Sequence, residues 1–246
     1  MSLWRVEWLR LMRTRRFLIV GGVYLFFGLL GPITARYLPD LLANLDEGAQ
    51  VLLPDPTPAD GITQYLGNAQ QLGLLAVIFV AGAALAIDAN PETSIFFRTR
   101  ASIPSILQPR FTVNAATAVV AFGIGAVAAW YETLILLGSI DLGGYLAGLA
   151  LYSVYLVFAV ALTALVAATL RNVAATVIVS LIVLIALGLL GLIRPIADWL
   201  PSTLLGATDI LIRGGAFDML PALVVTLVAI PACLVGAVAV FERREV

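Results

Sequence analysis

Six long apolar stretches constrain this chain more than any other feature. A helix needs about 20 apolar residues to cross the ~30 Å hydrocarbon core of a bilayer. Of the 246 residues, 61% are hydrophobic and only 12% are charged, whereas soluble domains are about 25% charged. The sequence predicts an all-α integral membrane fold with one transmembrane domain over residues 1–246. The expected spans are 17–35, 72–87, 113–137, 145–170, 173–193 and 219–241.

Residues 1–16 precede the first expected span and combine apolar with basic side chains. At helical spacing the apolar ones fall near one face, and they are Leu3, Trp4, Trp8, Leu11 and Met12. A helix of this kind lies in the headgroup layer of a membrane. We therefore expect an N-terminal amphipathic interfacial helix. Two roles stay open for it: an anchor that sets the topology, or a lever that passes motion to the first span.

The arginines are distributed unequally between the two sides of a six-span arrangement. The chain has no lysine, and eleven arginines fall on the side of the termini against three on the other side. Because cytoplasmic loops carry the excess of basic residues, both termini are expected in the cytoplasm. The predicted location is the cell membrane, crossed several times.

The missing residue types exclude several kinds of site. Without histidine or lysine, the chain cannot build a histidine-ligated metal site, a Ser-His-Asp triad or a Schiff base. Cys233 is the single cysteine and is interpreted as a packing residue. We therefore expect no catalytic, metal-binding or cofactor-binding residues in this chain. A net charge of −1 also argues against binding to nucleic acid.

The connection between the second and third spans, residues 88–110, is longer than a simple turn requires. Asn90 and Pro91 end the preceding helix, Thr93 or Ser94 can cap a new one, and Glu92 lies near its positive end. Apolar residues follow at 95–97. This composition is typical of a docking surface for another protein. The alternative is a second interfacial helix that contacts only lipid.

Two further features lie on or near the outer side. The loop 194–218 is half apolar, which favours short re-entrant or interfacial helices over a free loop. Glu132 is an acidic residue well inside an expected span, about 28 Å along the third one. A carboxylate facing lipid is costly, so Glu132 is a candidate for the transport path or its outer gate. The alternative is a wet residue at the membrane interface.

The order of these parts resembles the type-2 permeases of ATP-binding-cassette (ABC) transporters. The resemblance covers the whole chain and is most specific in three stretches, which are 56–60 with the polar residues up to Gln71, 88–110, and 241–246. It implies that 88–110 forms a coupling helix against an ATPase subunit. The residues that it implies for this coupling are Asp88, Glu92, Thr93, Phe96, Phe97, Arg98 and Arg100. Arg110 would match the basic residue that precedes the third span of the family.

The resemblance also implies partners. No phosphate-binding loop of the form GxxxxGK[ST] occurs in the sequence, so ATP and Mg²⁺ would be bound by two separate ATPase subunits. A second permease chain, identical or related, would complete the path, and membrane lipid would surround it. The implied activity is export of a hydrophobic or amphiphilic substrate in a prokaryotic cell. A secondary transporter and a non-transporting membrane scaffold remain as alternatives.

Overall fold

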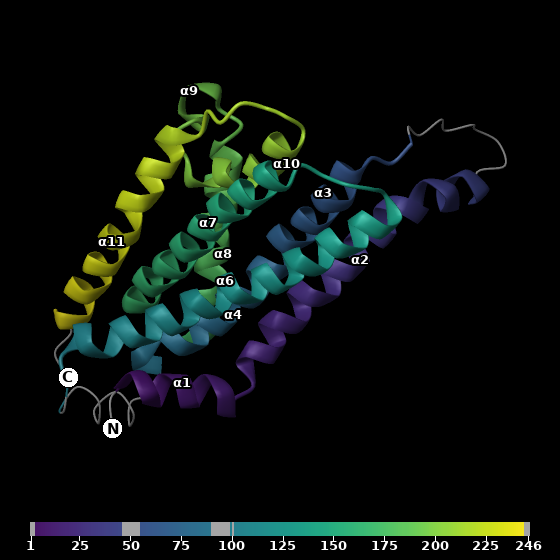
Figure 1. The fold of residues 1–246 in the computed structure, drawn as a ribbon. Coiled ribbons are helices and arrows are strands. Elements are labelled where there is room, and N and C mark those ends of the chain that lie inside the picture. The colour runs from purple at the N-terminus through teal and green to yellow at the C-terminus, as the bar shows by residue number, and fades with distance from the viewer. Residues whose placement is uncertain (1–2, 46–54, 90–98, 100, 244–246) are drawn as a thin grey trace.

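The computed structural model describes residues 3–45, 55–89, 99 and 101–243, and the regular structure in these segments is entirely helical. Figure 1 shows long helices that run side by side. The elements are α1 (Leu3–Arg13), α2 (Arg16–Leu45), α3 (Pro58–Asn68), the π-helical turn η1 (Ala69–Gly73), α4 (Leu74–Leu85), the 3₁₀ turn η2 (Ile87–Ala89), α6 (Ile103–Leu136), α7 (Leu142–Thr169), α8 (Val173–Leu190), α9 (Arg194–Ala197), the 3₁₀ turn η3 (Pro201–Gly206), α10 (Ala207–Ile212) and α11 (Leu220–Glu242).

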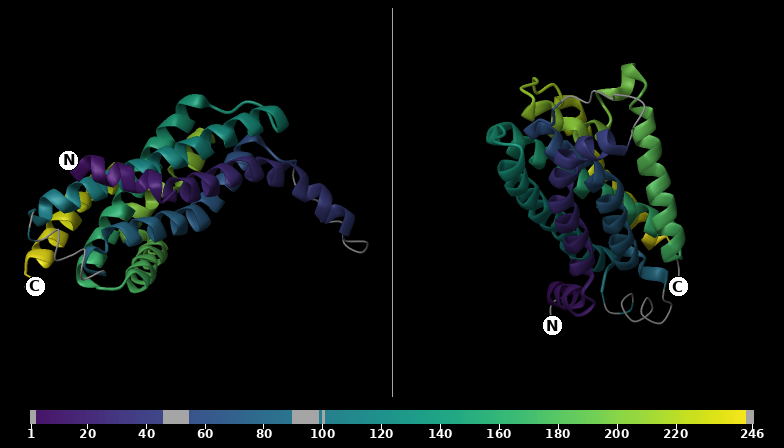
Figure 2. Two further views of the ribbon diagram at one scale, coloured as in Figure 1. Left: turned by 90° about the horizontal axis from the view of Figure 1, so that it is seen from below. Right: turned by 90° about the vertical axis from the view of Figure 1, so that its right-hand side faces the viewer.

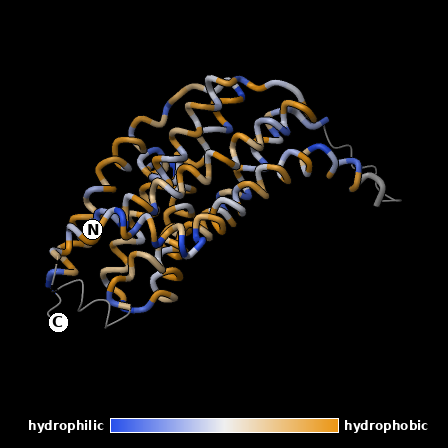
Figure 3. The backbone as a smooth tube through the Cα atoms, turned by 60° about the horizontal axis from the view of Figure 1, so that its bottom comes forward, coloured by the Kyte–Doolittle hydropathy of each residue, from blue (hydrophilic) through white to orange (hydrophobic). Residues whose placement is uncertain are grey.

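Among the described residues, six helical segments are long and apolar enough to cross a membrane, which confirms the predicted all-α integral membrane fold. They are Arg16–Leu41, Pro58–Leu85, Ile103–Leu136, Leu142–Thr169, Val173–Leu190 and Leu220–Glu242. In Figure 3 apolar residues follow these helices along most of their length, and hydrophilic residues gather toward the ends.

The second and third spans begin earlier than their apolar cores indicate. The second starts at Pro58 rather than 72, because Asp60 accepts hydrogen bonds from the backbone N–H (2.8 Å) and the hydroxyl (2.6 Å) of Thr57 and so caps the helix. The third starts at Ile103 rather than 113, with Pro104 in its first turn. Both extensions add polar residues that a search for apolar runs leaves out.

The core of the bundle is built where α2 crosses α6. Gly28 and Gly125 meet there, and a Cβ on either residue would collide with the backbone of the other helix. Around this crossing aromatic rings fill the interior: Phe122 stacks on Tyr152 with ring centroids 4.3 Å apart and on Tyr65 with 5.9 Å. The close helix approach and the stacked rings leave the middle of the bundle filled by side chains.

The spans differ strongly in how much of their surface the chain itself covers. Within an apolar 18-residue stretch of each span, the share of buried residues is 61% in Pro58–Leu85 and 67% in Leu142–Thr169, but 17% in Val173–Leu190 and 11% in Leu220–Glu242. Figure 2 shows α8 at the edge of the bundle. Large apolar faces of α8 and α11 are therefore left for lipid or for another protein chain.

The bundle has two distinct ends (Figure 1). One end carries α1 and the C-terminal end of α11, and we call it the α1 end; the other carries α9, η3 and α10, and we call it the α10 end. The predicted half-apolar segment is confirmed as short helices at the α10 end. Its Pro201–Ile212 part lies against α7, where Gly148 leaves room for the backbone of Thr208.

Candidate functional site

A buried ion pair at the α1 end joins two elements that are far apart in the sequence. Arg110 lies in the second turn of α6, and its Nε donates a 3.0 Å hydrogen bond to Oε1 of Glu7 in α1. Both residues are almost completely buried, with exposed fractions of 4% and 7%. Charged residues are rarely buried unless they are paired, so this contact fixes how α1 lies on the bundle.

The same arginine also binds the end of α4. Its Nη1 donates a 3.1 Å hydrogen bond to the carbonyl oxygen of Ala84. Because α4 ends at Leu85, this carbonyl belongs to the last helical turn, whose acceptors have no partner within the helix. Arg110 therefore replaces a missing backbone donor and attaches α4 to α6.

Two more side chains lie next to this ion pair, and of these two only Asn114 is buried. Asn114 lies one turn after Arg110, and its Nδ2 donates a 2.7 Å hydrogen bond to the Arg110 carbonyl. Arg10 lies 3.7 Å from the Glu7 carboxylate and is partly exposed. We call Glu7, Ala84, Arg110 and Asn114 the polar junction.

The polar junction lies where the connection between the second and third spans leaves and re-enters the bundle. It contains the end of α4, which precedes the connection, and the start of α6, which follows it. Glu7 adds α1 to these two helices. A buried charge pair in a medium of low dielectric is favourable only in a narrow range of geometries. The polar junction is therefore suited to make α1, the end of α4 and the start of α6 move together.

The structure describes only part of the predicted coupling set. Asp88 is half-buried in η2, four residues after Ala84 of the polar junction. The other six lie outside the described residues, and they are Glu92, Thr93, Phe96, Phe97, Arg98 and Arg100. Their role in coupling remains a prediction.

Glu132, the candidate for the transport path, lies near the α10 end of α6. It is half-exposed and precedes the last residue of the helix, Leu136, by about one turn. The neighbouring Thr133 is fully buried and packs next to Gly61 of α3. The structure therefore separates Glu132 from the polar junction by most of the length of α6.

A second polar cluster ties the α10 end together. Arg213, which follows α10, donates a 2.7 Å hydrogen bond to Asp60 of α3 and a 2.9 Å hydrogen bond to Asp209 of α10. The hydroxyl of Thr63 donates to the same Asp209 carboxylate at 2.6 Å. The hydrogen bonds to Asp60 and Asp209 hold the pKa of Arg213 above its ordinary value. The cluster fastens the short helices of this end to the start of the second span.

Sequence reasoning missed Glu7, the partner of Arg110, although the sequence contains a signal for it. Glu7 is the sole acidic residue before Asp40. It also shares a helical face with Leu3 and Leu11, because these residues are spaced four apart. An acid on the apolar face of an amphipathic helix indicates a buried basic partner. The sequence does not say which arginine that partner is.

Comparison with known proteins supports a transmembrane location. No family model matches the chain. The chain is similar to a protein of Bacillus subtilis (strain 168) described as "Uncharacterized transmembrane protein YxlG", with 23% identity over 158 residues. The match covers 63% of this chain and 61% of that protein, so it spans less than two thirds of the relative. Together with the six apolar helices, it identifies a multi-pass membrane protein.

Proposed function

We propose that this chain is the membrane-spanning permease subunit of an ABC transporter that exports a hydrophobic or amphiphilic substrate. Separate subunits would bind and hydrolyse ATP. The proposal rests on the order of parts along the chain, which resembles the type-2 permeases, and on six apolar helices that take up most of its length. With the α1 end in the cytoplasm, as the arginines indicate, the 88–110 connection faces the side where ATP is available.

The observation that carries the proposal is the polar junction. An ATPase that pushes on the 88–110 connection would displace the end of α4 and the start of α6. Arg110 is hydrogen bonded to both Ala84 and Glu7, so the same displacement would reach α1. Of the two roles left open for α1, this arrangement supports the lever over the passive anchor.

The path for substrate would lie between two permease chains. The middle of one chain is filled by stacked rings such as Phe122 and Tyr152, so a route through a single bundle would require them to separate. The weakly covered faces of α8 and α11 offer apolar surface to a second copy. Such a surface suits an apolar substrate, because apolar area removed from water favours binding.

The experiment that tests the proposal uses the full chain co-expressed with its ATPase and reconstituted into vesicles. Replacing Arg110 by Gln removes the positive charge of the polar junction and leaves that of Glu7 in place. We expect substrate-stimulated ATP hydrolysis and transport to fall together, while the ATPase remains bound. The matched control is Arg194→Gln, at an exposed arginine of the α10 end, and it should leave both activities unchanged.

Two results would overturn the proposal. In the first, no ATPase associates with the purified chain. In the second, transport persists without ATP and follows an ion gradient, which would favour a secondary transporter.

A further inference from the structure

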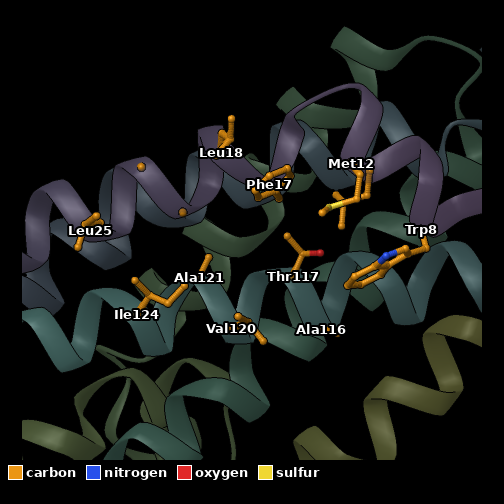
Figure 4. Close-up of a pocket in the computed structure, with 13 residues that line it drawn as sticks. Trp8, Met12, Phe17, Leu18, Leu25, Ala116, Thr117, Val120, Ala121 and Ile124 are labelled. Atoms are coloured by element: carbon orange, nitrogen blue, oxygen red, sulfur yellow. The ribbon is translucent and has the colours of Figure 1, made fainter.

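An apolar groove opens between α1, α2 and α6 on the α1 side of the bundle, and Figure 4 shows it with its lining residues. Its volume is about 490 Å³, which is within the range of small-molecule sites. Trp8 and Met12 close it from α1, Phe17 and Leu25 line it on α2, and Val120 and Ile124 line it on α6.

The described lining is almost entirely apolar. No charged residue is among the described residues that line the groove, and its polar side-chain groups are the indole N–H of Trp8 and the hydroxyl of Thr117, which donates to the carbonyl of Val113 at 2.7 Å. On the α2 wall lie Gly21 and Gly22, and a Cβ added to either would meet no atom within 4 Å. The groove is therefore an open slot for an apolar chain.

The groove has the length of a lipid tail segment. From Phe17 to Leu25 it follows α2 for about 12 Å at 1.5 Å per residue, while one leaflet of the hydrocarbon core is about 15 Å thick. Figure 4 shows the lining side chains in a row from Trp8 on α1 to Leu25 on α2. Because α1 is amphipathic and belongs at the headgroup level, the groove begins where the tails of that leaflet begin.

Positive charge lies in the turn that joins α1 and α2, two of the helices that line the groove. Met12 and Phe17 both line the groove, and the residues between them include Arg13 and Arg15. Arg15 has a φ of 53°, which belongs to the left-handed region and turns the chain from α1 into α2.

Arg13 and Arg15 are exposed, so their guanidinium groups are accessible from the headgroup layer. Arg16 is half-buried and instead lines a small cavity with Glu7, Ala84 and Asn114 of the polar junction. Guanidinium groups bind phosphate through charge-assisted hydrogen bonds.

We propose that the groove binds one acyl chain of an anionic phospholipid, whose phosphate is held by Arg13 and Arg15. The lipid comes from the leaflet on the α1 side. It fills the slot between α2 and α6 and holds α1 against them. The site requires the six-span fold and the position of α1 but not transport activity, so it can be tested apart from the proposed function.

The test uses Trp8 as a built-in reporter. In the full chain with Trp4, Trp130 and Trp199 replaced by Phe, the fluorescence of Trp8 is measured in phosphatidylcholine bilayers. These contain increasing fractions of brominated phosphatidylglycerol or of brominated phosphatidylcholine. We expect phosphatidylglycerol to quench Trp8 at a several-fold lower fraction, because each arginine near the bilayer favours an anionic lipid roughly fivefold. Equal quenching by the two lipids would overturn the proposal.

Two sets of variants separate the tail site from the headgroup site. Gly22→Leu should fill the slot and abolish the preferential quenching, whereas Gly188→Leu on α8, another glycine with open space at its Cβ, should leave it unchanged. Arg13→Gln with Arg15→Gln should reduce the preference for phosphatidylglycerol while quenching by phosphatidylcholine persists. A preference that survives both sets would overturn the assignment.

Two other occupants would give different results. If a second copy covers the groove, Trp8 would resist quenching by either brominated lipid and a cysteine at Val120 would crosslink between chains. If the transported substrate occupies it, substrate would relieve the quenching in competition with lipid. Either result would overturn the lipid site.

Discussion

Arg110 and Glu7 are separated by 103 residues along the chain, yet Nε of Arg110 lies 3.0 Å from Oε1 of Glu7 in the interior of the α1 end. An interfacial helix held only by lipid would have no need for such a contact. The pair makes α1 part of the folded protein. The pair also lies in the protein interior, where burying either charge by itself would lower the free energy of unfolding.

Removing one charge of this pair is therefore expected to destabilise the protein. Glu7→Gln removes the carboxylate that the buried Arg110 guanidinium contacts at 3.0 Å, and breaking a buried ion pair costs about 3–5 kcal/mol. Thermal unfolding of the purified chain in detergent should show a clearly lower midpoint. An unchanged midpoint would mean that water reaches Arg110 and that the contact contributes little.

Replacing both charges by apolar residues should separate stability from coupling. Buried ion pairs can be exchanged for well-packed apolar side chains at little cost, so Glu7→Met with Arg110→Met should unfold near the wild-type temperature. If the polar junction transmits motion, this double variant should still show reduced substrate-stimulated ATP hydrolysis. Full stimulation by a stable double variant would limit the pair to a structural role.

The second polar cluster, at the α10 end, is partly exposed, so it should control local motion there rather than overall stability. Exposed ion pairs contribute about 0–1 kcal/mol each, so Arg213→Gln should change the unfolding midpoint little. Loss of its bonds to Asp60 and Asp209 should instead speed hydrogen exchange in Pro201–Ile212. Arg194→Gln serves as the control, and equal exchange in both variants would contradict this expectation.

The orientation of the bundle can be tested with a membrane-impermeant thiol reagent. On a Cys233→Ser background, cysteines at Asp55 or Asp141 should be labelled in intact cells, because both residues are exposed and belong to the side that the arginine distribution predicts to be outside. Cysteines at Arg5 or Arg243, exposed at the α1 end, should react only after the cells are opened. The reverse pattern would invert the topology and remove the basis of the coupling proposal.

Glu132 gives a test of charge in the proposed path. Glu132→Gln keeps the size of the side chain and removes its charge, so we expect transport of a cationic substrate to fall more than transport of a neutral one. The neutral substrate is the internal control, and expression should stay near the wild-type level because the residue is half-exposed. An equal effect on both substrates would assign Glu132 to the interface.

The sequence predicts the spans because the length of an apolar run is a local property. It predicts the start of the second span poorly, since Asp60, Gln64 and Asn68 interrupt that run. The helix continues there because tertiary contacts compensate for its polarity: Tyr65 and Ile62 are fully buried, and Gly31 of α2 lies against the Tyr65 backbone. This burial depends on contacts with other helices, which a prediction from the local sequence does not include.

The polar junction was harder to predict for a related reason. Arg110 alone looks like one more basic residue that sets the topology, and Glu7 looks like a minor break in a basic helix. Their pairing becomes visible only when α1 folds back onto α6. The same limit applies to the groove, because the residues that line it come from three helices and none of them is unusual alone.

The unequal covering of the spans has a consequence for biogenesis. Segments such as α8 and α11, almost uninterrupted in their apolar residues and barely covered by the rest of the chain, can leave the translocon singly and dissolve in lipid. The segment Pro58–Leu85 contains polar residues and is largely enclosed by its neighbours, so it inserts stably only once α6 and α7 have been synthesised to receive it. Membrane integration of this protein is therefore expected to depart from the order in which its helices are translated.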